Sequence, residues 1–211
     1  MFKPKPHRAL KNQSSSTSVS DLTPFNATSH LFRICVLGAR SCGKTCLIER
    51  FVDGLYNTET EPTIEDTYEV ITKMGNEMVT THILDTAGEE LSSGMYSSYI
   101  KKADGFVVCY KVQDHQSFTV ACKMMAEIRR LRYEDVPLIL VGNDFSGSDN
   151  PTVVVTKQEV NDQCNLHQIQ QRYSISAENH TNVSAPFVLI AQLLLKNPPP
   201  KKRKDKIPGE E

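Results

Sequence analysis

The residues whose types and spacing point most clearly to a chemical role form a short run directly after the apolar segment Leu31 to Leu37. The run fits the pattern GxxxxGK[ST] and reads Gly38, Ala39, Arg40, Ser41, Cys42, Gly43, Lys44 and Thr45. In such a loop the backbone N–H groups surround a polyphosphate, the positive end of the following helix favours anions, and the lysine adds a full charge. We expect this loop, with Cys46 in the first helical turn, to hold the phosphates of a nucleotide.

Two further segments offer ligands for the terminal phosphate and its metal ion. Thr63, in the run Pro62 to Tyr68, has a hydroxyl group and an N–H group, and Asp85 follows a strand that ends in an apolar residue. Gly88 presents an N–H group without a side chain. Hydroxyl and carboxylate oxygens suit Mg²⁺, so the predicted metal ligands are Thr45, Thr63 and Asp85.

Together these segments resemble those of the Ras-type small GTPases, and the resemblance runs from about Leu31 to Leu195. It implies an α/β fold of the P-loop NTPase type, with a mostly parallel six-stranded sheet covered by helices on both faces. It also implies GTP and GDP as ligands, Mg²⁺ as cofactor, and a role as a molecular switch in signal transduction.

Alternating strand and helix patterns supply the elements that must position these residues. Short apolar runs predict strands at 31–37, 66–73, 78–84, 105–112, 136–142 and 171–175. Helical stretches begin near Lys44, Glu90, Asp114, Thr156 and Asn182. Continuous apolar strands are typical of a sheet buried on both faces, whereas Gly75-Asn76 indicates an antiparallel hairpin.

The composition is that of one globular domain. The chain has 211 residues, 39% hydrophobic residues and a net charge of −1, which argues against nucleic-acid binding. We expect a disordered basic and Ser-rich extension over residues 1–30, a G domain over 31–196, and a Pro/Lys-rich tail over 197–211. Six irregularly spaced cysteines indicate reduced thiols in the cytoplasm and no disulfide framework.

The ends of the sequence bear on location. Lys201 to Lys206 is basic, and three interpretations stay open: a nuclear-import signal, a contact with an anionic membrane, or a solvated tail. The sequence carries neither a prenylation nor a myristoylation motif. We therefore expect a cytoplasmic monomer with at most weak electrostatic membrane contact.

The base-recognition segment departs from the family pattern Asn-Lys-x-Asp. Asn143 is present, but Asp144 replaces the lysine and Ser146 stands where the guanine-binding aspartate is expected. Loss of a charge-assisted pair of hydrogen bonds would weaken guanine binding by about 1.5–3 kcal/mol. Two registers stay open: true loss of that contact, or an insertion that brings Asp149 to the base.

The remaining base contacts are implied by the resemblance. The segment beginning Ser176-Ala177 resembles the family's Ser-Ala-Lys loop, so the N–H group of Ala177 is expected to face the base carbonyl, although Glu178 replaces the lysine. Tyr56 occupies the place where the family positions an aromatic edge against the base.

Hydrolysis is expected to be slow. Lys44, Glu89 and Arg40 are the candidate catalytic residues, and Glu89 stands where the family has a glutamine that orients the attacking water. An ionised carboxylate cannot donate a hydrogen bond, and it adds negative charge beside the phosphates. For Arg40 three interpretations stay open: a built-in arginine finger, a block to an activator's arginine, or simple exposure.

The run Pro62 to Tyr68 resembles the region that binds effector proteins in the family. Its acidic residues Glu65 and Asp66 suit a basic partner surface, and the following strand could pair with a partner strand; exchange or activator proteins are further expected partners. An exposed acidic edge that only maintains solubility is the simpler interpretation. Two other functions stay open: an interaction module that binds nucleotide poorly, and a small-molecule kinase, for which the sequence shows no recognisable lid or second basic substrate site.

Overall fold

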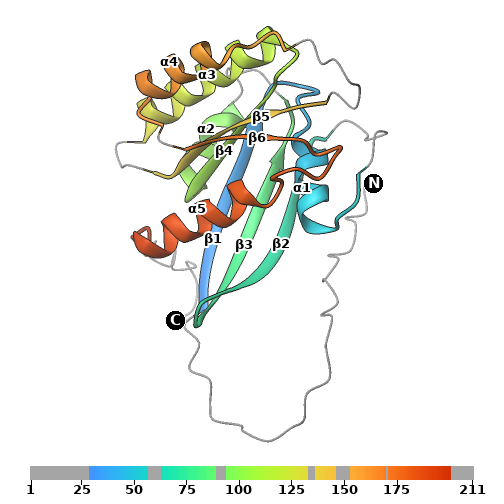
Figure 1. Ribbon diagram of the computed structural model, residues 1–211. Helices are drawn as coiled ribbons and strands as arrows, with labels where there is room; N and C mark the ends of the chain where they lie inside the picture. Colours follow the sequence, from blue (N-terminus) through green and yellow to red (C-terminus); the bar gives the residue numbers. More distant parts are fainter. Residues whose placement is uncertain are drawn as a thin grey trace, which may run out of the picture.

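The computed structural model describes residues 29–56, 63–88, 94–132, 136–145, 153–169 and 171–200. Within these ranges one sheet of six strands has the order β2-β3-β1-β4-β5-β6 (Figure 1). The strands are β1 (Ser29–Gly38), β2 (Glu65–Met74), β3 (Glu77–Thr86), β4 (Gly105–Lys111), β5 (Leu138–Asn143) and β6 (Arg172–Ile175). Every neighbouring pair is parallel except β2 and β3. The predicted mostly parallel α/β sheet is therefore confirmed.

The antiparallel pair is the predicted hairpin around Gly75-Asn76. Gly75 has φ 63°, a left-handed conformation that glycine adopts without steric cost. The second strand of the hairpin is longer than the pattern predicted, because Asp85 pairs with Val36 of β1 on one side and with Asp66 of β2 on the other. Asp85 therefore belongs to the sheet instead of following it.

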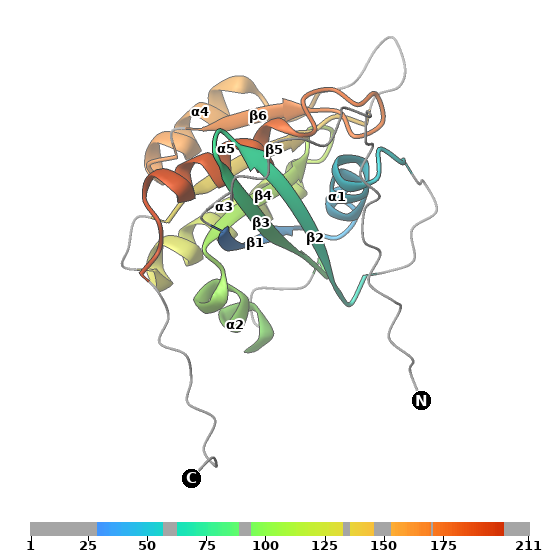
Figure 2. The same ribbon diagram turned by 90° about the horizontal axis from the view of Figure 1, so that it is seen from below.

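The helices cover both faces of the sheet (Figure 2). They are α1 (Lys44–Val52), α2 (Gly94–Lys102), α3 (His115–Leu131), α4 (Lys157–Leu166) and α5 (Ala185–Lys196). Side chains of α2, α3 and α4 share a core with Phe106 and Val108 of β4, whereas α1 and α5 pack with Val107 and Cys109 of the same strand. Successive residues of a strand point to opposite faces, so a continuous apolar run fills both cores.

The cysteines are unbridged, as expected, and all six lie in the described part of the chain. Cys42 is fully buried and burial raises the pKa of its thiol, which disfavours the reactive thiolate form. No helix among the described residues is both long and apolar enough to cross a membrane.

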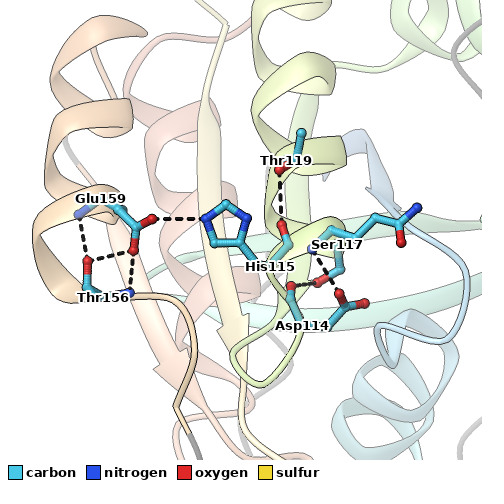
Figure 3. Close-up of polar contacts among 7 residues, drawn as sticks. Asp114, His115, Ser117, Thr119, Thr156 and Glu159 are labelled. Atoms are coloured by element: carbon cyan, nitrogen blue, oxygen red, sulfur yellow. Dashed lines mark hydrogen bonds and ion pairs between the residues drawn. The ribbon is translucent and has the colours of Figure 1, made fainter.

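The N-terminal ends of α3 and α4 are joined by polar contacts (Figure 3). Thr156 caps α4: its hydroxyl accepts a hydrogen bond from the N–H of Glu159 (3.2 Å), and the Glu159 carboxylate accepts one from the N–H of Thr156 (2.8 Å). This reciprocal pair is a capping box. Nε2 of His115 lies 2.9 Å from the same carboxylate. The hydrogen bonds from Thr156, followed by the one from His115, lower the pKa of Glu159 to about 2.

We predict that Glu159→Gln removes a pH-dependent contribution to stability. Because the pKa of Glu159 is lowered in the folded state, its contribution is complete above the ordinary value of 4.5 and is lost as the pH falls towards about 2. Thermal unfolding of the full chain should show a higher Tm for the unsubstituted protein at pH 7, and a difference that shrinks from pH 5 to pH 3. A difference that stays constant with pH would contradict this account.

Candidate functional site

The GxxxxGK[ST] run forms a turn between the end of β1 and the start of α1. Ser41 (φ 60°) and Gly43 (φ 84°) have left-handed backbone conformations, which curl the loop. No side chain caps the N-terminus of α1, and its first turn has no acidic residue. The free N–H groups and the helix dipole are therefore available to an anion.

Lys44 holds this loop from inside. Its side chain is buried, and Nζ donates hydrogen bonds to the carbonyl oxygens of Gly38 (3.2 Å) and Ala39 (3.1 Å). An ammonium group has three N–H donors, so one donor remains after these contacts. A phosphate group in the loop would compensate the buried positive charge.

The three predicted metal ligands lie together at the mouth of the loop. Oγ1 of Thr45 donates to Oδ2 of Asp85 (2.7 Å) and lies 2.9 Å from Oγ1 of Thr63. A hydroxyl group can donate a single hydrogen bond. Thr45 donates its one hydrogen bond to Asp85 and therefore accepts a hydrogen bond from Thr63. Residues from the loop, β3 and the segment before β2 thus meet in one chain of hydrogen bonds.

Asp85 carries the strongest sign of a missing partner. It is fully buried, and its Oδ1 has no hydrogen-bond partner among the described residues. Burial raises the pKa of its carboxyl group above 3.8, although the hydrogen bond from Thr45 and the charge of Lys44 oppose the rise. A buried oxygen of this kind, beside two hydroxyl groups, fits the hard oxygen ligands that Mg²⁺ requires.

Two segments close over the phosphate loop. A Cβ atom placed on Gly88 would lie 2.3 Å from both N and Cα of Arg40, so only glycine fits there. The N–H of Ala87 donates to the carbonyl of Ile64 (3.2 Å), which links the segment after β3 to that before β2. The segments before β2 and after β3 are thus joined to each other, and Gly88 packs directly against the phosphate loop.

Asn143 connects the phosphate loop to the expected base end of the site. Its Nδ2 donates to the carbonyl of Cys42 (3.3 Å), and its Oδ1 accepts from the N–H of Ala177 (3.3 Å). Gly43 lies against this amide, because a Cβ at residue 43 would be 2.4 Å from Nδ2 of Asn143. In this conformation the N–H of Ala177 points to Asn143, and its contact with a base stays a prediction.

The side chain of Asp144, which replaces the family's lysine, is bound by a residue that follows β4. Its Oδ1 accepts a hydrogen bond from Nε2 of Gln113 at 2.6 Å. The neighbouring Phe145 ring packs on Gly43 and lies 5.1 Å from Nζ of Lys111. The sequence patterns did not indicate these contacts of Gln113 and Lys111, because they join β5 to the end of β4.

The other predicted base contacts lie at the same end. Tyr56 is half-buried, and its pKa is raised first by burial and then by the nearby charge of Glu178. Ser176 exchanges two backbone hydrogen bonds with Thr181 (3.1 and 2.9 Å), while its Oγ accepts from the N–H of Asn179 (3.2 Å). These bonds give the loop after β6 a defined shape.

The remaining candidates are placed as follows. The side chain of Arg40 is exposed, and Cys46 is buried in α1. Glu89, Ser146, Asp149 and Pro62 lie outside the described residues, so the predictions about them stay open.

A glycine-rich turn between a central parallel strand and a helix, with a buried lysine and a Thr-Thr-Asp group at the strand ends, defines a P-loop nucleotide-binding protein. The model of the Ras family matches residues 33–196, and the chain therefore belongs to the Ras family.

Curated relatives agree with this assignment. GTP-binding protein Rit2 of Mus musculus and of Rattus norvegicus is 36% identical over 113 residues, which cover 53% of this chain and 52% of the relative. GTP-binding protein Rit1 of Mus musculus is 33% identical over 118 residues, or 56% of this chain and 54% of the relative. The chain thus spans about half the length of the curated relatives it matches.

We predict that Asp85→Asn abolishes stabilisation by Mg²⁺. At a ligand concentration of 100 Kd a bound nucleotide adds about 2.7 kcal/mol to the free energy of unfolding. A neutral amide is a poorer Mg²⁺ ligand than a carboxylate, so the part of this gain that EDTA removes should disappear in the variant. Differential scanning calorimetry with GDP, in Mg²⁺ or in EDTA, measures this directly.

Asp104→Asn is the matched control for this prediction. Asp104 is also buried, but it directly precedes β4 and is not part of the phosphate loop or the metal-ligand group. Its Oδ2 accepts a hydrogen bond from the N–H of Arg33 (2.8 Å). This substitution should lower Tm and preserve the Mg²⁺-dependent gain. An unchanged gain in Asp85→Asn would remove Asp85 from the metal site.

Proposed function

We propose that this chain binds GTP and GDP with Mg²⁺ and acts as a signalling switch. The observation that carries the proposal is the group formed by Thr45, Thr63 and Asp85, with a buried carboxylate oxygen that has no partner among the described residues. Mg²⁺ bound there would neutralise charge on the phosphates and on Asp85. Lys44 and the loop N–H groups would hold the phosphates, while Thr63 and Gly88 would bind the terminal one.

The switch follows from where Thr63 is placed. It lies two residues before the edge strand β2, whose first residues Glu65 and Asp66 are exposed. The hydroxyl of Tyr99 in α2 donates a hydrogen bond to Oε2 of Glu65 (2.7 Å), so α2 and the exposed start of β2 form one connected surface. Loss of the terminal phosphate would release Thr63 and alter this surface. An effector with a basic surface is the partner that fits it.

Slow hydrolysis is part of the proposal. Glu89 cannot donate a hydrogen bond to a transition-state oxygen while it is ionised. The side chain of Arg40 is exposed, so no protein group described here fixes it in the direction that an arginine finger requires. The loaded state of the switch would therefore persist unless a partner supplies the missing catalytic group.

A second function is favoured by one observation at the base end. Asp144 accepts from Gln113 and leaves the ring face without the family's lysine. A module that binds nucleotide weakly and serves mainly to bind partners would fit this change. For either function we propose a cytoplasmic monomer with no role in nucleic-acid binding. The basic segment 201–206, which lies outside the described residues, is our basis for proposing a nuclear or membrane-peripheral pool.

The nucleotide that copurifies with the full chain distinguishes these functions. We predict that denaturation releases GDP or GTP in near-stoichiometric amount, identified by anion-exchange chromatography against standards. Adenine nucleotide would contradict guanine specificity. Protein that is empty and shows no heat on titration with Mg²⁺-GTP would favour the weak-binding module.

We further predict that Glu89→Gln speeds hydrolysis by at least roughly tenfold, because an amide can both accept from the attacking water and donate to the phosphate. Single-turnover conversion of bound GTP to GDP is the measurement. Glu90→Gln removes the same charge at the next residue and should leave the rate unchanged. Equal rates for Glu89→Gln and the unsubstituted protein would show that the slow step has another cause.

A further inference from the structure

The guanidinium group of Arg50 joins two loops that are distant in the sequence. Arg50 lies in the last turn of α1, where Nη1 donates to the carbonyl of Gly54 (2.6 Å) and Nη2 lies 3.4 Å from the carbonyl of Glu178. Its Nε is buried and has no hydrogen-bond partner within the described ranges. Burial of the Nε–H group without a partner costs free energy of desolvation. In this conformation the two Nη groups are directed at two backbone oxygens.

Both loops carry residues expected at the nucleotide base. Gly54 is two residues before Tyr56, and Glu178 directly follows Ala177, whose N–H is bound by Asn143. Through Arg50 the two loops lie next to each other, at the end of the site where a base is expected. Tyr56 and Glu178 are close enough for the charge of Glu178 to raise the pKa of the tyrosine.

We propose that Arg50 is a positioning residue for the nucleotide base, which it serves by holding the Tyr56 loop and the Ala177 loop at a constant separation. This inference rests on the proposed function. Among the described residues, the side-chain hydrogen bonds of Arg50 go to Gly54 and Glu178 and not to the phosphate loop or the metal ligands. Arg50 is five positions after Thr45 in the helix, a rise of roughly 7.5 Å. Its effect is confined to the base half of the site.

The chemistry requires arginine. A guanidinium group presents several donors in a rigid plane and can bind two carbonyls at once, whereas the ammonium of lysine is a single donor centre on a flexible stem. Arg50→Lys therefore keeps the charge and loses one of the two loop contacts. Arg50→Ala loses both.

The test measures release of a fluorescent GDP from the full chain at a series of Mg²⁺ concentrations. We expect release to be roughly tenfold faster from Arg50→Ala and about threefold faster from Arg50→Lys, as hydrogen bonds from a charged donor are lost. The Mg²⁺ concentration that half-maximally slows release should stay within twofold of the unsubstituted protein. A merely structural role would alter the metal half of the site as well.

Arg129→Ala is the matched control. Arg129 donates from Nε to the carbonyl of His167 and from Nη1 to that of Val136, each at 3.2 Å, on the opposite face of the sheet. Its loss should lower Tm and leave GDP release unchanged. If Arg129→Ala speeds release as much as Arg50→Ala, the effect is general loosening and the inference is wrong.

The remaining outcomes are also decisive. An unsubstituted protein that retains no fluorescent GDP overturns the proposed function and this inference together. Mg²⁺-dependent retention with unchanged release from both Arg50 variants overturns this inference alone. A half-maximal Mg²⁺ concentration that shifts by as large a factor as the release rate also overturns this inference alone. If Arg50→Ala fails to fold, Arg50→Lys provides the comparison.

Discussion

The phosphate end of the site depends on one buried carboxylate. Asp85 lies in β3 with sheet neighbours on both sides, so its backbone cannot move to bring the side chain to water. Its carboxylate is disfavoured there unless cationic or donor groups face it. Thr45 faces one oxygen, Lys44 contributes charge, and the other oxygen has no partner among the residues described. The fold thus maintains an unfavourable group at a position where a divalent cation would relieve it.

The same carboxylate explains why the segment before β2 and the phosphate loop meet at one point. Because the Thr45 hydroxyl donates its one hydrogen bond to Asp85, it acts as the acceptor towards the hydroxyl of Thr63. The position of Thr63 is therefore coupled to the protonation and metal binding of Asp85 through two short hydrogen bonds. Gly88, three residues beyond Asp85, contacts Arg40 so closely that any side chain would push the segment off the loop. The predicted metal ligands, the phosphate loop and the segment before β2 form one connected unit.

Local patterns predicted most of the fold and the position of the loop that we expect to hold phosphates. Apolar runs located the strands, Gly75-Asn76 located the hairpin, and the spacing of Gly38, Lys44 and Thr45 located the loop, since each signal depends on neighbours in the sequence. The apolar pattern predicted that this strand ends at Leu84, because a charged residue such as Asp85 is not typical of a buried strand position. In the structure β3 continues to Thr86. Contacts such as Arg50 with Glu178 and Gln113 with Asp144 carry no local signal. They arise only when the parallel strands bring their carboxyl ends to one edge.

The two ends of the site are organised on different principles. At the phosphate end, partners are missing within the described residues, so a ligand would complete the hydrogen bonding. At the base end, protein groups already bind one another: Asn143 with Ala177, Asp144 with Gln113, and Arg50 with two carbonyls. A ring that enters there must use donors and acceptors that remain, or displace existing bonds at a cost of about 0.5–1.5 kcal/mol for each neutral pair. Affinity would therefore come mainly from phosphate and metal, while discrimination among bases would depend on how rigidly these loops are held.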